Sequence, residues 1–127
     1  MTGGGRRILL AEDDRFLRKA AAATLSRHGY EVLTASDGEE ALAIARAQAP
    51  DLILLDLIMP KLHGFEVLKH LKAEPATAAI PVIVLSNLGQ DQDVQQAMEH
   101  GAAAYCVKAN LSLQELVRQV AEILAGG

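Results

Sequence analysis

The chain has a single cysteine, and no apolar stretch approaches the roughly 20 residues that a membrane-spanning helix needs. With only Cys106 available, an internal disulfide is excluded. The place of Cys106 inside an apolar run, residues 104–107, predicts a buried and unreactive thiol. The first seven residues lack the apolar region of a secretory signal. We therefore expect a cytoplasmic protein with no membrane insertion.

The chain also has few basic residues, and it is short. Lysine and arginine number 12 against 16 acidic residues, which gives a formal charge of -4, and no basic stripe is present. Direct binding to nucleic acid is therefore not expected. A chain of 127 residues with 50% hydrophobic residues fits one domain with a proper core and leaves no room for a second. We expect a flexible N-terminus at residues 1–6 and a single domain over residues 7–125.

Apolar runs alternate five times with stretches of helical periodicity, which is typical of an α/β protein with a parallel sheet. We expect strands near residues 7–11, 30–35, 52–56, 81–86 and 104–107. The central run at 52–55 shows no polar alternation, as expected when helices cover both faces of a sheet.

Five helices are expected between and after these strands. The first should end at Gly29, and the third should cover residues 64–74. The second should begin at a cap formed either by Ser36 with Glu39 or by Asp37 with Glu40, and should stop at Pro50. The fourth, residues 91–100, has the thinnest apolar stripe, and the last opens with Ser112 and Glu115 in capping-box spacing. The expected buried face of the first helix consists of Phe16, Leu17, Ala20, Ala21 and Leu25.

Four of the apolar runs end in polar side chains, which should gather at one edge of the sheet. They are Glu12, Asp13 and Asp14 after the first run, Asp56 after the third, Ser86 after the fourth and Lys108 after the fifth. Strand alternation predicts that at most two of the first three acids share a cleft. Carboxylates about 4 Å apart repel by roughly 4 kcal/mol at an effective dielectric near 20, so a cation is needed. Mg²⁺ prefers such oxygen ligands, which predicts a magnesium-dependent phosphoryl site.

This pattern closely resembles the receiver domain of two-component response regulators, over almost the whole chain. The segment 8–14 is similar to the first strand of that family with its acidic pair, here Glu12 and Asp13. The segment 54–60 is similar to the surroundings of the phosphorylated aspartate, here Asp56. The resemblance implies a doubly wound, flavodoxin-like (βα)5 fold with a five-stranded parallel sheet in the order 2-1-3-4-5. Three more positions match the family, namely the hydroxyl of Ser86, the ammonium of Lys108 and the aromatic switch Tyr105.

The resemblance implies a stand-alone, chemotaxis-type signalling switch and not an enzyme. Asp56 would accept a phosphoryl group from a sensor histidine kinase or a histidine phosphotransfer protein, assisted by Lys108 and Ser86. Mg²⁺ would be bound by Asp13, Asp56 and the backbone carbonyl of Ile58, with Glu12 reaching it through water. Ser86 and Tyr105 would then alter the surface around the fourth helix, the last strand and the last helix, which a downstream target protein reads.

The chain departs from the family pattern at several positions. Ala109 replaces the proline that commonly follows the family's lysine, so we expect a trans peptide bond there. Asn87 is bulkier than the residue often found beside the hydroxyl position, so we expect it either to narrow access to Asp56 or to form a new hydrogen bond. Ile58 and Leu88 stand where the family sets the lifetime of the acyl phosphate. Neither can orient an attacking water, which predicts a long-lived phosphorylated state.

Three alternatives remain open to test. A degenerate receiver would act as a docking module that needs no phosphorylation. A phosphohydrolase with an aspartyl-phosphate intermediate would need an acid two residues after Asp56, where Ile58 stands. A flavin carrier would need a hydroxyl-rich phosphate loop where the chain has acids at residues 12–14.

Overall fold

The computed structural model describes residues 5–87 and 91–126. Within them, five strands alternate with five α-helices, and a short 3-10 helix, Lys108–Asn110, precedes the last one. The strands are β1 (Arg7–Ala11), β2 (Glu31–Ala35), β3 (Leu52–Asp56), β4 (Val82–Ser86) and β5 (Ala104–Val107). The helices are α1 (Arg15–Arg27), α2 (Gly38–Gln48), α3 (Gly64–Ala73), α4 (Asp91–Glu99) and α5 (Leu113–Gly126). Each predicted strand agrees with the structure to within one residue.

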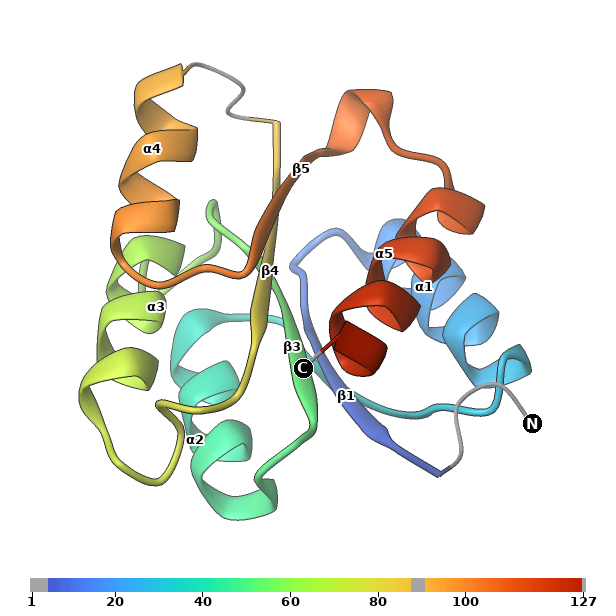
Figure 1. The fold of residues 1–127 in the computed structure, drawn as a ribbon, viewed down its shortest axis with the longest axis horizontal. Helices are drawn as coiled ribbons and strands as arrows, with labels where there is room; N and C mark the ends of the chain where they lie inside the picture. The colour runs from blue at the N-terminus through green and yellow to red at the C-terminus, as the bar shows by residue number, and fades with distance from the viewer. Residues whose placement is uncertain (1–4, 88–90, 127) are drawn as a thin grey trace.

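The strands form one parallel sheet in the order β2-β1-β3-β4-β5, which confirms the predicted fold class. Figure 1 shows α2, α3 and α4 on one side of the sheet and α1 and α5 on the other. Chain order reverses direction between β1 and β3, and in open sheets of this kind ligands bind outside the carboxyl ends of the strands at that point.

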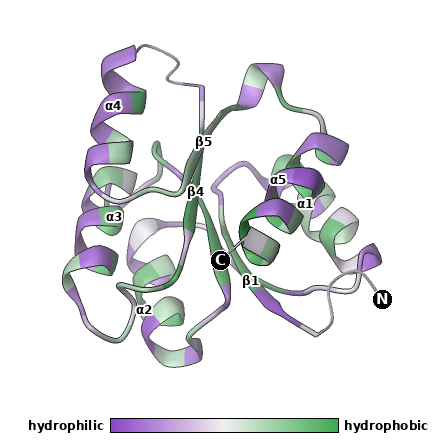
Figure 2. Ribbon diagram, in the orientation of Figure 1, coloured by the Kyte–Doolittle hydropathy of each residue, from purple (hydrophilic) through white to green (hydrophobic). Residues whose placement is uncertain are grey.

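Two apolar cores explain why the central strands have no polar alternation. Leu9 and Ile53 face the core beneath α2 and α3, whereas Leu10 and Leu54 face the core beneath α1 and α5. All five residues of β3 and all five of β4 are buried. The hydropathy colouring in Figure 2 agrees, because the middle of the sheet is hydrophobic and the outer sides of the helices are largely hydrophilic.

Polar side chains cap the helices at the positions where the chain changes direction. Asp37 accepts a hydrogen bond from the Glu40 amide at the start of α2, and Ser112 accepts one from the Glu115 amide at the start of α5. Both contacts confirm predicted capping pairs. Helix α1 ends before Gly29, whose φ of +91° suits glycine and few other residues.

The predicted buried face of α1 is wrong at two positions. Phe16 is 86% exposed and Ala20 is also exposed. The two residues lie four positions apart, so they share one side of the helix, next to the buried stripe. The first turn of α1 also begins beyond the end of β1, so the sheet does not cover it. The stripe that packs on the sheet consists of Leu17, Ala21, Thr24 and Leu25, with Leu17 only partly buried.

Cys106 is 8% exposed, so the predicted burial of the thiol is confirmed. No peptide bond between described residues is cis, so the bond from Lys108 to Ala109 is trans as expected. No helix in the described part of the chain is long and apolar enough to cross a membrane. The first four residues of the expected flexible N-terminus lie outside the described residues.

Candidate functional site

The carboxyl ends of β1, β3 and β5 surround an open cleft of about 390 Å³, which we call the acidic cleft. Four carboxylates and one ammonium reach it, together with an apolar and an amide side chain. Its lining residues are Glu12, Asp13, Asp14, Asp56, Ile58, Asn87 and Lys108.

Asp56 is the last residue of β3 and is only 3% exposed. Its Oδ1 accepts a hydrogen bond of 3.1 Å from the Ile58 amide, and its Oδ2 accepts one of 2.8 Å from Nζ of Lys108. Gly64 lies against the same turn, where a Cβ atom would stand 2.5 Å from the Asp56 carbonyl oxygen. Close packing and two hydrogen bonds therefore fix the direction of the Asp56 carboxylate.

Glu12 follows β1 and is completely buried. Its Oε2 accepts a hydrogen bond of 3.0 Å from the Asp14 amide. Its Oε1 lies 2.5 Å from Nζ of Lys108, yet the contact does not have hydrogen-bond geometry, so this buried oxygen has no hydrogen-bond donor among the described residues. Burial raises the pKa of Glu12 to about 7, and the nearby Asp56 carboxylate adds to the rise against the opposing effect of Lys108.

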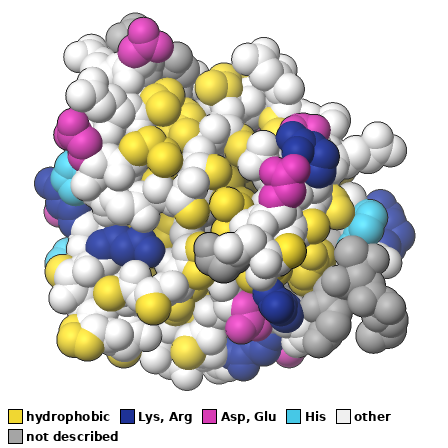
Figure 3. All heavy atoms as spheres, viewed as in Figure 1, with side chains coloured by type: hydrophobic (Ala, Val, Ile, Leu, Met, Phe, Trp, Pro, Cys, Tyr) yellow, Lys and Arg dark blue, Asp and Glu magenta, His cyan; other side chains and the backbone are white. Residues whose placement is uncertain are grey.

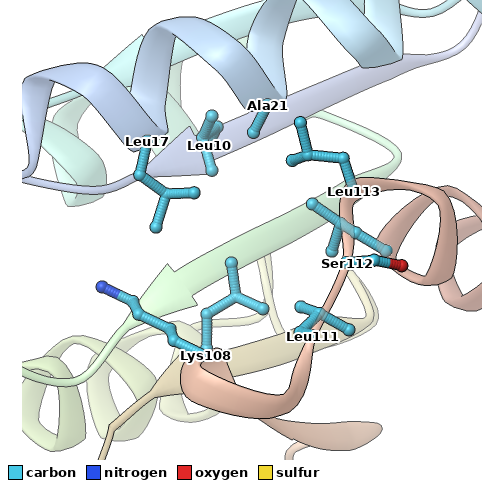
Figure 4. Close-up of a pocket in the computed structure, with 9 residues that line it drawn as sticks. Leu10, Leu17, Ala21, Lys108, Leu111, Ser112 and Leu113 are labelled. Atoms are coloured by element: carbon cyan, nitrogen blue, oxygen red, sulfur yellow. The ribbon is translucent and has the colours of Figure 1, made fainter.

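Lys108 supplies the positive charge between Glu12 and Asp56, and its side chain is 16% exposed. Burial lowers the pKa of Lys108, but its contacts with Asp56 and Glu12 outweigh this, and the pKa stands above its ordinary value. Figure 4 shows the side chain beside a small apolar pocket, near Leu17 and Leu111, with the ammonium directed away from Leu111. The apolar packing of the stem thus directs the charge toward the acidic cleft.

The acids of the cleft fit a divalent cation. One carboxylate oxygen from each of Glu12, Asp13 and Asp56 lies within 4.8 Å of the other two. The single ammonium of Lys108 contacts both Glu12 and Asp56, so three clustered carboxylates share one positive charge, and a divalent cation would supply the rest. Mg²⁺ prefers one or two carboxylates with water and phosphate oxygens completing its shell.

Ser86 and Tyr105 lie next to the acidic cleft but do not line it. Ser86, the last residue of β4, is completely buried, and Tyr105 on the neighbouring strand β5 is partly buried. Burial raises the pKa of the Tyr105 hydroxyl, and a hydrogen bond with Ser86 opposes that rise. The two side chains are therefore linked to each other in this structure.

Two features of the loop that follows β1 were not predicted from the sequence. Asp14 caps α1, because its Oδ1 accepts hydrogen bonds from the amides of Phe16 and Leu17. Arg18 donates to the carbonyl oxygens of Glu12 and Asp13, at 2.8 and 3.3 Å. The position of Arg18, one helical turn after the capping Asp14, is the sequence signal that points to this contact.

The strand alternation that we assumed for the three acids does not apply to them. Strand β1 ends at Ala11, so Glu12 and Asp13 belong to a loop and both contribute an oxygen to the cluster. Asn87 is exposed at the rim of the cleft, and Leu88 lies outside the described residues.

Comparisons with known proteins place the chain among receivers. Protein PilH of Pseudomonas aeruginosa is 34% identical over 120 residues, which cover 94% of this chain and 98% of PilH. The gliding motility regulatory protein of Myxococcus xanthus is 40% identical over 114 residues, which cover 90% of this chain but 15% of that protein. The chain spans 15% to 48% of the length of several curated relatives that it matches.

A solved receiver structure agrees with the fold. The receiver domain of sensor histidine kinase PA1611 from Pseudomonas aeruginosa, solved with a magnesium ion coordinated in its active site cleft, superposes with a TM-score of 0.85 at 28% identity. The match covers 97% of this chain and 99% of that one. The family model for the response regulator receiver domain matches residues 8–121. The chain therefore belongs to the response regulator receiver family, whose members are regulatory phospho-acceptors of two-component signalling and not classical enzymes.

Proposed function

We propose that this chain is a phospho-accepting switch in which Asp56 carries the phosphoryl group. The observation that carries the proposal is the position of the Asp56 carboxylate, 3% exposed in the acidic cleft and 2.8 Å from the ammonium of Lys108. Glu12 and Asp13 stand beside it with oxygens suited to Mg²⁺. Receiver domains interact with histidine kinases. The proposed donor is therefore a sensor histidine kinase or a histidine phosphotransfer protein, met in the cytoplasm.

Phosphoryl transfer requires charge balance more than covalent assistance from the protein. An oxygen of Asp56 forms the new bond to phosphorus, and the bond from phosphorus to the histidine nitrogen breaks. The imidazole keeps the electron pair of that bond and takes up a proton. Mg²⁺, held by Asp13, Asp56 and the Ile58 carbonyl with Glu12 reaching it through water, would supply positive charge to the phosphoryl oxygens.

Lys108 and Ser86 are proposed to hold the product. The ammonium of Lys108 already contacts Asp56, so a short movement brings it to a phosphoryl oxygen. Ser86 is the last residue of β4, the strand next to β3, and its hydroxyl can donate a hydrogen bond. Because Ser86 hydrogen-bonds Tyr105, a movement of Ser86 toward the phosphoryl group changes the environment of the tyrosine.

The proposed output is a change in the surface formed by α4, β5 and α5. Figure 3 shows hydrophobic side chains gathered on this face, over β5 and between α4 and α5. Met98 of α4 is 45% exposed. An apolar area of this kind supports binding to a downstream target protein, and Tyr105 lies on the strand between the two helices.

Incubation with a small phosphodonor tests the proposal, with the intact mass as the readout. The wild type should gain one phosphoryl group in the presence of Mg²⁺ and should gain none with a chelator. Asp56→Asn should gain none in either condition, and Asp51→Asn, which changes an exposed acid at the other end of β3, should behave as the wild type. No labelling of the wild type would favour the alternative, a degenerate receiver that acts as a docking module without phosphorylation, and equal labelling of Asp56→Asn and the wild type would show that another residue is the acceptor.

A further inference from the structure

Arg18 connects helix α1 to the loop that carries two of the proposed metal ligands. A single guanidinium nitrogen, one of the two terminal nitrogens of Arg18, donates to the carbonyl oxygens of both Glu12 and Asp13. The side chain is partly buried, and the shorter of these bonds measures 2.8 Å. Arg18 thus contacts the backbone of both residues without itself lining the acidic cleft.

The loop needs such a contact because the sheet does not hold it. Strand β1 and its ladder end at Ala11, and the next backbone contact is the Glu12 amide, which donates to the Ala35 carbonyl. From Asp13 onward the loop depends on side chains. Asp14 anchors its far end by capping α1, and Arg18 binds the carbonyls between the two fixed ends.

We propose that Arg18 is a positioning residue for the cation site: it holds the Glu12 and Asp13 carbonyls so that both carboxylates face the cleft. The inference rests on the proposed metal site and deepens it. A fixed carbonyl fixes its peptide plane and thereby restricts the backbone of the residues on both sides of that plane, so holding these two carbonyls limits the directions in which the Glu12 and Asp13 side chains leave the backbone. Residues that orient metal ligands in this way contribute strongly to metal affinity.

The guanidinium suits this task better than an ammonium would. Its donors lie in one rigid plane, so one side chain can serve two neighbouring carbonyls, and it stays charged at every relevant pH. Its positive charge also lies beside an acidic cluster whose members repel one another. A lysine at position 18 would keep the charge but lose the fixed arrangement of donors.

Binding of Mn²⁺, which accepts the same carboxylate and carbonyl ligands as Mg²⁺, tests the inference. We would titrate the protein with Mn²⁺, measure the free ion by electron paramagnetic resonance, and verify by competition that Mg²⁺ displaces it. The variants are Arg18→Met, which keeps an apolar stem, and Arg18→Lys. Arg27→Met is the matched control, because it removes the same charge from the same helix but its guanidinium contacts Thr24.

We expect Arg18→Met to weaken Mn²⁺ binding about tenfold, the lower end of the range for residues that orient ligands. Arg18→Lys should fall between this variant and the wild type, and Arg27→Met should bind as the wild type does. Urea unfolding of the metal-free variants supplies the readout for a merely structural role. If a variant stays fully folded at the assay temperature, nearly every molecule is in the state that binds the metal, so lower global stability cannot explain a weaker affinity.

Wild-type affinity in a folded Arg18→Met variant would overturn the inference, and so would an equal loss in Arg27→Met. Should Arg18→Met not fold, Arg18→Lys decides in the same way, since wild-type affinity in that variant would mean that the donor geometry is irrelevant. If the wild type shows no saturable Mn²⁺ binding, the metal site proposed for the cleft fails and the role of Arg18 fails with it. Normal binding by the wild type with unaffected Arg18 variants rejects the role of Arg18 alone.

Discussion

Replacement of Lys108 by methionine removes the one ammonium that contacts both Glu12 and Asp56 in the described part of the cleft. The side chains of the three residues are 16%, 0% and 4% exposed, so water cannot easily replace the lost charge. Methionine keeps much of the apolar volume of the lysine stem, which lies beside Leu17 and Leu111. The variant therefore tests charge with little change in packing.

The expected loss of stability is large. Removal of one partner from a buried ion pair costs roughly 3–5 kcal/mol, because the remaining charge stays buried without compensation. The ammonium of Lys108 retains some contact with solvent, so we expect a value near the lower end, about 3 kcal/mol, without metal at pH 8. Urea unfolding followed by circular dichroism in a chelating buffer measures this difference.

The loss should depend on pH, and the sign follows from Glu12. Burial raises the pKa of Glu12 to about 7 from an ordinary 4.5, so the folded state holds this proton more tightly than the unfolded state does. The stability gained from the protonated carboxyl is complete below pH 4.5 and is lost as the pH rises through about 7. At pH 5 the carboxyl can stay protonated without Lys108, so the cost of Lys108→Met should be clearly smaller than at pH 8.

Added Mg²⁺ should also reduce the cost, because the cation replaces the missing positive charge. Lys61→Met is the matched control, since the Lys61 side chain is 60% exposed where it pairs with Asp37 at 3.6 Å, so water can replace its charge and the pair contributes little. The reasoning is refuted if Lys108→Met is as stable at pH 8 as Lys61→Met. It is also refuted if the cost stays the same at pH 5.

Three further results are expected. Ile58 is 52% exposed at the rim of the cleft and cannot orient an attacking water, so the phosphorylated wild type should persist for minutes or longer. Ile58→Asn should shorten this lifetime, which is measured by the decay of the phosphorylated mass. Asp14→Ala removes the cap of α1 and should lower the free energy of unfolding by about 1 kcal/mol, and an unchanged urea midpoint would contradict this. Burial raises the pKa of the Cys106 thiol, so a thiol reagent at pH 8 should label it only after unfolding, and immediate labelling of the folded protein would show that it is accessible.

The sequence predicted the strands well because both cores depend on short apolar runs. Residues 52–55 are all apolar, which is typical of a strand whose two faces are both covered by helices. The cap of α5 was equally clear, since Ser112 stands at the required spacing before Glu115, whereas for α2 the sequence left two pairs open and the structure shows Asp37 with Glu40. Local rules of this kind need no knowledge of the tertiary structure.

The sequence was less informative where packing decides. Phe16 has the hydrophobicity of a core residue, yet its place on the first turn of α1 leaves it 86% exposed. The contact from Arg18 to the loop carbonyls requires the helix and the loop to be placed in space first. The complete burial of Glu12 also arises from the assembled fold, and it is the main cause of the raised pKa.

The position of the phosphoryl group tests the account most directly. Reduction of the phosphorylated protein with borohydride converts an aspartyl phosphate to homoserine, which peptide mass spectrometry can assign to one residue. The account predicts homoserine at position 56 after treatment with phosphodonor and Mg²⁺, and none when a chelator is present. Homoserine at another position, or at position 56 to the same extent with the chelator, would contradict it.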